Sequence, residues 1–226
     1  NSVINQNYKN FEYIIVDGNS TDGTKEIILN NKKHFSNIII KKDKNLYQAL
    51  NRGIDSSKGV IVGIMHSGDI YNYNSAIKDS INFLLFNKLD FMFSNLLIVN
   101  YDNTIYRTVK NNLYKRLFLR FGIQPPHPTL FLWKKLHYQI KRYSIDYKSE
   151  ADFDYFCKLF NKSYNWSNLN KYTIKQYRGG LSDTGLLQKI KSSFLIKKIL
   201  KKNKIFSHQF FFILKVLFRL KETFFK

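Results

Sequence analysis

The stretch FEYIIVDGNSTDGT, residues 11–24, decides how this chain folds. Residues 11–16 are rich in β-branched and aromatic side chains, which is typical of a buried strand. Residues 17–24 form a dense cluster of turn-forming and helix-capping residue types. Residues 25–35 then carry apolar side chains at helical spacing. The order strand, polar turn, helix predicts the beginning of an α/β sheet.

The same alternation continues outward from this stretch. It predicts strands at 38–40, 60–65 and 91–100, and helices at 47–57 and 75–86. Elements alternating at this spacing favour a parallel sheet with its loops at the carboxyl ends of the strands. The alternation of expected strands and helices becomes less regular after residue 113. There we expect a strand at 129–133, a helix at 151–160, strand-like segments within 164–174 and a loop at 178–182.

Composition excludes several classes of protein. The chain has 226 residues, of which 44% are hydrophobic and 16% aromatic, so it is not a disordered polypeptide. The single cysteine, Cys157, excludes a disulfide scaffold and a Cys-based zinc site. No run of about 18 apolar residues is present, so we expect no membrane-spanning helix.

The charge of the chain is strongly positive and unevenly placed. The formal net charge is +21, and residues 1–110 carry 13 Lys and Arg against 10 Asp and Glu. Nearly all the excess therefore lies after residue 110, where it would attract nucleic acid, an anionic membrane or phosphorylated substrates. The sequence has no helix-turn-helix, zinc or aromatic stacking motif of nucleic-acid-binding proteins. We therefore expect no nucleic-acid partner.

The segment 186–226 reads as a basic amphipathic tail. From Leu195 onward, apolar residues share one half of a helical wheel and Lys residues share the other. This pattern is typical of a helix lying in the plane of an anionic membrane surface. A terminal helix that packs on the core shows the same pattern. We favour the membrane, because seven Phe residues follow Lys204.

Three short segments could carry chemistry. Asp17 and Asp69 each follow an expected strand, where a carboxylate can bind a ligand or a divalent metal. Both also sit among residues that form ordinary turns, and a histidine such as His66 is more often packed than a ligand. Residues 149–154, SEADFD, begin an expected helix. These acids could complement the helix dipole or include a general base, and the residues alone favour the dipole.

Taken in order, these segments resemble a known family. SVINQNYKNFEYIIVDGNSTDGTKEII and DKNLYQALNRGIDSSKGVIVGIMHSGDIY resemble glycosyltransferase family 2, which has the GT-A fold. The later PPHPTLF, EADFDYFCKL and RGGLS fall in the expected order, so the resemblance covers about residues 1–185. It implies a Rossmann-like mixed sheet flanked by helices. It also implies a further strand before Asn1, so we expect domain 1–185 to be N-terminally truncated.

The resemblance implies an inverting transfer of a sugar and assigns roles to single residues. Asp152 would be the catalytic base, and Asp69 would bind a divalent metal, Mn²⁺ or Mg²⁺. The donor, a nucleotide-diphosphate sugar, would be bound by Asp17, Asn19, Ser20, Asp43, Asn51, Ser67 and Asp69. The acceptor would be a glycan or a lipid-linked sugar of bacterial surface polysaccharide synthesis. The enzyme would be cytoplasmic and peripheral at the inner face of the plasma membrane, bound there through its tail.

The sequence departs from the family pattern at several positions. Gly68 stands where many members have the first acidic residue, which puts metal dependence in question. Ala151 replaces the Glu before the expected base, while Asp152 is retained. Gln48 stands where Asp is common and Asn45 where Gly is. The alternative hypothesis is therefore a non-catalytic relative that binds only nucleotide or membrane.

Overall fold

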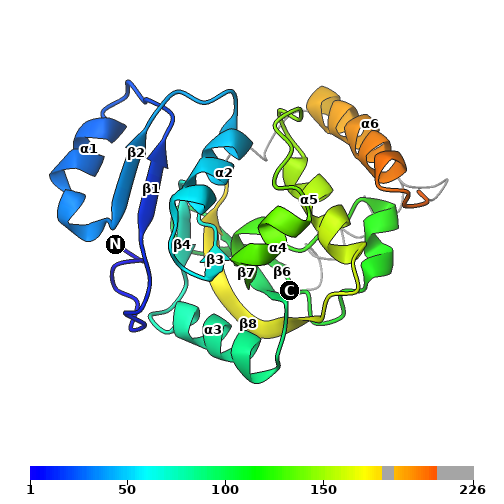
Figure 1. Ribbon diagram of the computed structural model, residues 1–226, viewed down its shortest axis with the longest axis horizontal. Coiled ribbons are helices and arrows are strands. Elements are labelled where there is room, and N and C mark those ends of the chain that lie inside the picture. Colours follow the sequence, from blue (N-terminus) through cyan, green and yellow to red (C-terminus); the bar gives the residue numbers. More distant parts are fainter. Residues whose placement is uncertain (180–185, 208–226) are drawn as a thin grey trace.

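The computed structural model describes residues 1–179 and 186–207, and within residues 186–190 only the backbone. Its strands form two sheets (Figure 1). The smaller sheet pairs β1 (Ile14–Asp17) with β2 (Asn37–Ile40) in parallel. The larger has the order β3-β7-β5-β8-β4, with β6 paired to β5. Its strands are β3 (Ile61–Gly63), β4 (Asp69–Tyr71), β5 (Phe91–Val99), β6 (Ile105–Val109), β7 (Phe131–Trp133) and β8 (Trp166–Tyr177).

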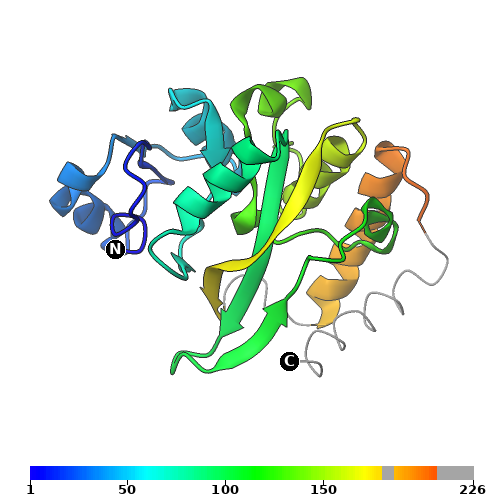
Figure 2. The ribbon, with the colours of Figure 1, turned by 90° about the horizontal axis from the view of Figure 1, so that it is seen from below.

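Six α-helices accompany the strands in the described residues. They are α1 (Thr24–Asn30), α2 (Leu46–Ser56), α3 (Ala76–Phe86), α4 (Lys134–Gln139), α5 (Ala151–Phe160) and α6 (Leu186–Lys202). Short 3₁₀ turns lie at Lys32–His34, Arg116–Phe121 and His127–Thr129. The helix expected at 25–35 ends earlier, at Asn30, and one of these turns follows it. In both ribbon views α1 and α6 lie at opposite ends of the molecule (Figures 1 and 2).

The larger sheet is mixed. Strands β5 and β8 run parallel, whereas the pairs β3/β7, β5/β7, β5/β6 and β4/β8 are antiparallel. The parallel sheet that the alternation predicts is therefore wrong for most of these pairs, and the mixed sheet that the resemblance implies is confirmed. The reason is local for β6, since residues 100–104 are too few to hold a crossover helix. They close a hairpin instead, which extends from the body of the molecule (Figure 2).

Alternating side chains of the sheet supply two cores. Phe91 and Phe93 of β5 point to one face, where they pack with α4, α5 and α6. Met92 lies between them on the opposite face and packs with Leu84 and other residues of α3. Residues of successive strand positions point to opposite faces, so one strand contributes to both cores. The sheet is thus buried on both sides at β5.

Helix α6 packs against α5, and this corrects the expectation for part of the tail. Ile196, Ile199 and Leu200 are at most 4% exposed and belong to the larger core. These residues were expected to face a membrane, but they face the protein. The remainder of the expected amphipathic pattern, residues 208–226, lies outside the described residues. No helix in the described part of the chain is long and apolar enough to cross a membrane.

Candidate functional site

Asp17 is the last residue of β1 and is buried at 7% exposure. Its two carboxylate oxygens accept hydrogen bonds from Ser20, one from the backbone N–H at 2.8 Å and one from the hydroxyl at 2.6 Å. Asn19 lies between them in a left-handed conformation and is exposed. The carboxylate therefore fixes the turn after β1. That position is also the carboxyl edge of the strand, where α/β proteins bind ligands.

Helix α2 lies directly on β1. A Cβ atom at Gly53 would come within 3.0 Å of the Val16 side chain, so glycine is what allows this approach. Arg52 of the same helix forms an ion pair with Asp43, whose side chain is only 4% exposed. The charge of Asp43 is thus balanced by Arg52, and the ion pair holds Asp43 next to the amino end of α2.

The segment His66–Asp69 follows β3. Asp69 is 8% exposed, and its Oδ1 accepts a hydrogen bond from Gln176 of β8 at 2.8 Å. Its Oδ2 accepts one from the His66 backbone N–H at 3.2 Å. Burial raises the pKa of the Asp69 carboxyl above its usual value, and the bond from Gln176 opposes this shift. Ser67 and Gly68 between them are exposed.

Gly68, which stands where an acidic residue was expected, has a backbone conformation that suits glycine. Its φ is +87°, in the left-handed region that side chains rarely adopt. Asp69 donates its backbone N–H to the His66 carbonyl at 3.1 Å, which closes the tight turn. A side chain at position 68 would have to adopt this left-handed conformation, which glycine adopts without strain.

The residues around Asp69 fit a metal only in a limited way. The described residues contain no group of three or more His, Cys, Asp or Glu side chains arranged to hold a metal ion. Asp69 could supply one carboxylate oxygen. A magnesium-type ion accepts such a site when phosphate oxygens and water complete its shell. The described residues therefore fit a metal that arrives with a diphosphate better than one held by their own side chains alone.

A row of buried rings runs inward from His66. Its Nε2 lies 2.9 Å from Nδ1 of His127, and Nε2 of His127 lies 2.7 Å from the Tyr143 hydroxyl. The Tyr143 ring stacks on Tyr155 with centroids 3.9 Å apart. Burial lowers the pKa of His127 to about 3, and the nearby His66 ring adds to the shift. Burial raises the pKa of Tyr143 well above its usual value.

Asp152 lies in the first turn of α5 and is half-buried. Its Oδ1 accepts a hydrogen bond from the Tyr47 hydroxyl at 3.3 Å, and its Oδ2 accepts one from the Gln124 amide at 2.5 Å. Burial, followed by the charge of Asp152, raises the pKa of Tyr47, so this hydroxyl keeps its proton. Both oxygens of the carboxylate are thereby held in place.

Asp154, two residues further along, has a different environment. It is fully buried and forms an ion pair with Lys158 at 2.6 Å. Its other oxygen accepts a hydrogen bond from the Asn203 amide at 2.9 Å, which ties α5 to the end of α6. The structure therefore separates the two acids of the DFD sequence, since Asp154 joins two helices and Asp152 faces the site.

Helix α2 holds the segment that leads to Asp152. The Asn45 amide donates to the carbonyls of Ile145 and Tyr147 at 2.9 and 3.1 Å. The Asn51 amide donates to the Tyr143 carbonyl at 2.9 Å and accepts from the Tyr143 N–H at 3.1 Å. The sequence predicted Asn51 as a donor-binding residue. In the structure its amide holds the backbone of Tyr143, and its role toward a donor stays a prediction.

These contacts bring two of the expected residues into one network. Asp69 contacts His66, and the row of rings continues through His127 to Tyr143. Tyr143 stacks with Tyr47, which bonds to Asp152. In the described residues, neither Asp17 nor Asp43 shares a hydrogen bond with Asp69 or Asp152. Sequence reasoning missed Gln124, Gln176, His127 and Tyr143, although the PPHPTLF match held His127.

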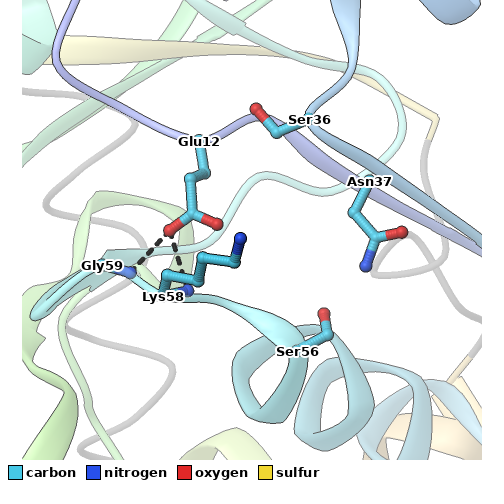
Figure 3. A pocket seen from close by; sticks show the side chains of 6 residues that line it. All are labelled: Glu12, Ser36, Asn37, Ser56, Lys58 and Gly59. Carbon is cyan, nitrogen blue, oxygen red and sulfur yellow. Dashed lines mark hydrogen bonds between the residues drawn. The ribbon is translucent and has the colours of Figure 1, made fainter.

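A cavity of about 580 Å³ lies elsewhere, at the amino ends of the strands (Figure 3). It is lined by residues that precede or begin β1, β2 and β3 and by the end of α2. Glu12 bridges it by accepting the backbone N–H groups of Lys58 and Gly59 at 2.8 and 2.5 Å. Because Asp17 and His66 lie at the opposite ends of these strands, this cavity is separate from the network.

Comparison with known families shows which family the chain belongs to. The family model of glycosyl transferase family 2 matches residues 1–169. The chain belongs to this family. Two relatives from Escherichia coli are named UDP-Glc:alpha-D-GlcNAc-diphosphoundecaprenol beta-1,3-glucosyltransferases. WfgD is 29% identical over 129 residues, which cover 54% of this chain and 49% of WfgD. WfaP is 37% identical over 100 residues, which cover 43% of this chain and 39% of WfaP.

Solved structures confirm the GT-A fold of this family 2 chain. TarS of S. aureus in complex with UDP-GlcNAc superimposes with a TM-score of 0.68 at 19% identity. That match covers 88% of this chain and 60% of the TarS chain. The mannosyltransferase PcManGT of Pyrobaculum calidifontis, in complex with GDP-Man and Mn²⁺, gives a TM-score of 0.64 at 13% identity. It covers 89% of this chain and 57% of PcManGT. The chain spans less than two thirds of each of these proteins.

Proposed function

We propose that the protein transfers a sugar, with inversion, from a nucleotide-diphosphate donor to a hydroxyl group of a glycan or lipid-linked acceptor. The observation that carries this proposal is the contact network between Asp69 and Asp152. One end is a buried carboxylate at the carboxyl edge of the sheet, where a donor diphosphate would bind. The other end is a half-buried carboxylate with both oxygens held, which suits a base for an acceptor hydroxyl.

The reaction is a single displacement. Asp152 takes the proton of the acceptor hydroxyl while that oxygen forms a bond to the anomeric carbon. The bond from this carbon to the diphosphate oxygen breaks, and the nucleoside diphosphate leaves with the electron pair. Because attack and departure occur on opposite faces of the carbon, the configuration inverts. Tyr47 and Gln124 orient the base by holding one oxygen each.

Asp17, Asn19, Ser20 and Asp43 would bind the nucleoside, and Ser67 and Asn51 would contribute to the sugar-diphosphate side. Support for this division is the place of Asp17 and Ser67 at the carboxyl ends of β1 and β3. The names of the two E. coli relatives and the ligand of TarS point to a uridine diphosphate sugar. We therefore expect UDP to be the nucleotide bound.

Asp69 would hold a Mn²⁺ or Mg²⁺ ion that neutralises charge on the leaving diphosphate. The protein's own part is the position of this carboxylate, which Gln176 and the His66 N–H fix. The Mn²⁺ of PcManGT, which shares the fold, supports a metal in this family member.

Replacing Asp69 by Asn tests the donor site. We expect UDP to bind the wild-type chain more tightly in the presence of Mn²⁺, and the Asp69→Asn variant to lose this metal-dependent gain. The reason is that the amide is neutral and offers a weaker metal ligand than the carboxylate. Calorimetric titration of UDP with and without Mn²⁺ measures the effect. An unchanged Mn²⁺ dependence in the variant would contradict the assignment of Asp69.

The acceptor would be lipid-linked, and the protein would work peripherally at the inner, cytoplasmic face of the plasma membrane. The named acceptor of both E. coli relatives, a diphosphoundecaprenol-linked sugar, supports this proposal. The positive charge after residue 110 supports it as well. The inward face of α6 is buried in the core, so contact with an anionic membrane surface falls to the outward lysines and to the remainder of the tail.

A charge-reversal pair tests this membrane contact. We expect the double variant Lys198→Glu/Lys201→Glu, on the exposed side of α6, to bind anionic vesicles more than about tenfold more weakly than wild type. Each basic residue near such a surface contributes about 1 kcal/mol. Vesicle co-sedimentation measures the binding. The control, Lys32→Glu/Lys33→Glu, makes the same charge change just after α1. An equal loss of vesicle binding in both variants would contradict a specific membrane-binding face on α6.

A non-catalytic relative remains the second candidate, because Gly68 and Ala151 depart from the family pattern. It predicts nucleotide binding without turnover. Substitution of Asp152 distinguishes the two candidates, as described in the Discussion.

A further inference from the structure

We propose that His66 donates a hydrogen bond from its Nδ1–H to the diphosphate of the donor, and that His127 and Tyr143 are positioning residues that keep the proton on that nitrogen. The inference rests on the proposed function, because it names a further binding residue for the same donor. It concerns the row of rings His66, His127 and Tyr143, to which the mechanism above assigns no task.

The place of His66 is the first step. It follows β3 at the carboxyl edge of the sheet, and its backbone N–H bonds to the Asp69 carboxylate. The residues after it, Ser67 and Gly68, are exposed, while His66 itself is half-buried. Its Nε2 faces His127, and residues 1–179 and 186–207 provide no hydrogen-bond partner for its Nδ1. Nδ1 is therefore the nitrogen left for a ligand beside Asp69.

The second step is the direction of the hydrogen bonds. A bare imidazole nitrogen accepts a hydrogen bond much better than a phenol oxygen does, and a phenol is the better donor. We infer that the 2.7 Å contact is Tyr143 O–H donating to Nε2 of His127, and that the neighbouring Tyr155 hydroxyl donates to Tyr143 rather than accepting from it. A neutral histidine carries one proton, so that of His127 must lie on Nδ1. From there it is donated across 2.9 Å to Nε2 of His66.

The third step is that the row keeps this direction. His127 is 5% exposed and remains neutral, since burial lowers its pKa to about 3. Tyr143 is 2% exposed and remains a phenol. Its backbone is clamped by Asn51, and its ring is stacked on Tyr155. Neither ring can therefore turn to reverse the row without breaking buried contacts.

The direction of these hydrogen bonds decides which nitrogen of His66 can donate to a charged diphosphate oxygen. With Nε2 occupied as an acceptor, the proton of the His66 ring lies on Nδ1. A hydrogen bond from a neutral N–H to a charged oxygen is stronger than one between neutral groups. The site thus supplies the diphosphate with a directed donor beside Asp69, where Gly68 supplies no side chain.

The proton position can be measured directly. We expect two-bond ¹H–¹⁵N correlations of the ¹⁵N-histidine-labelled chain to show His66 as the Nδ1–H tautomer. In Tyr143→Phe, His127 loses the group that fixes its proton, and we expect His66 to become a mixture of tautomers. This measurement needs no donor. Finding wild-type His66 mainly as the Nε2–H tautomer would overturn the inference.

Two substitutions of His66 separate binding from structure. Asn carries its amide nitrogen on Cγ, as Nδ1 is carried in histidine, and Gln places its amide one bond further out, near Nε2. We expect His66→Asn to bind UDP within about threefold of wild type. We expect His66→Gln to bind it about tenfold or more weakly, as fits the loss of one hydrogen bond to a charged group.

Thermal stability should rank the two variants in the opposite order. His66→Gln can still accept the His127 N–H, whereas His66→Asn leaves this buried donor unpaired. We therefore expect the lower Tm in His66→Asn, and His34→Asn, beyond α1, serves as the neutral control. A merely structural His66 would make His66→Asn the weaker variant in both measurements.

The outcomes distinguish this inference from the proposed function. If wild type binds UDP and His66→Gln binds it as tightly, the inference is wrong and the proposed function stands. If wild type binds neither UDP nor GDP, with or without Mn²⁺, the proposed function fails and so does the diphosphate role of His66.

Discussion

Replacing Asp152 by Asn is expected to lower kcat for sugar transfer by a factor on the order of 10³, within the usual range for a general base. The amide cannot take the acceptor proton, yet it has the same shape and can still contact Tyr47 and Gln124. We expect Tm and the affinity for UDP to stay close to wild type. Transfer rates at saturating donor and acceptor, with calorimetric titration of UDP, measure the two effects separately.

The matched control for this prediction is Asp146→Asn. Asp146 lies on the segment that leads to α5, carries the same charge and is exposed. We expect its substitution to change kcat by less than about twofold. If wild type has turnover and Asp152→Asn retains it, the base is another residue. If wild type binds UDP but transfers no sugar to any acceptor tested, the non-catalytic relative is the better description.

Replacing Asp154 by Ala is expected to lower the free energy of unfolding by about 3 kcal/mol, because it breaks a buried ion pair. Asp154 is fully buried, and its loss leaves Lys158 and the Asn203 amide without their carboxylate. Lys158 retains a route to solvent, since its side chain is 20% exposed, which places the estimate at the lower end of the usual range. Denaturant unfolding followed by circular dichroism measures it.

The control for Asp154 is Asp55→Ala. Asp55 also forms an ion pair, with Arg142 at 2.7 Å, but the two side chains are 38% and 46% exposed. Exposed pairs contribute at most about 1 kcal/mol. If Asp154→Ala and Asp55→Ala lower the free energy of unfolding by similar amounts, burial does not determine how much these ion pairs contribute to stability. The inference that Asp154 joins α5 to α6 would then fail.

The local parts of the fold could be predicted from the sequence. Residues 11–24 indicate a strand followed by a turn, and the structure has both, although β1 spans Ile14–Asp17 where 11–16 was expected. The helix at 151–160 is also where its pattern predicts. The DFD sequence, in contrast, carries no sign of which acid is buried, because that depends on Lys158 and on the distant Asn203.

The features that the sequence did not predict depend on residues far away in the chain. Strand β4 is three residues long and exists by pairing with β8, so that Asp69 lies opposite Gln176. The ring row joins residue 66 to residues 127 and 143, and no spacing rule connects them. Helix α6 shows why an amphipathic pattern leaves two outcomes, since a core and a membrane select the same apolar face.

Helix α2 has a consequence for exchanging parts between family members. Asn45, Tyr47 and Asn51 hold the segment from Tyr143 to Asp152, while Arg52 of the same helix holds Asp43. Suppose that residues 138–152 are replaced by those of a relative in order to change the acceptor. The new segment would then lie against Asn45, Tyr47 and Asn51, whose hydrogen bonds fit the original segment. Residues 43–56 and 138–152 therefore form one structural unit. In chimeras, we expect acceptor choice to change only when both segments are exchanged together.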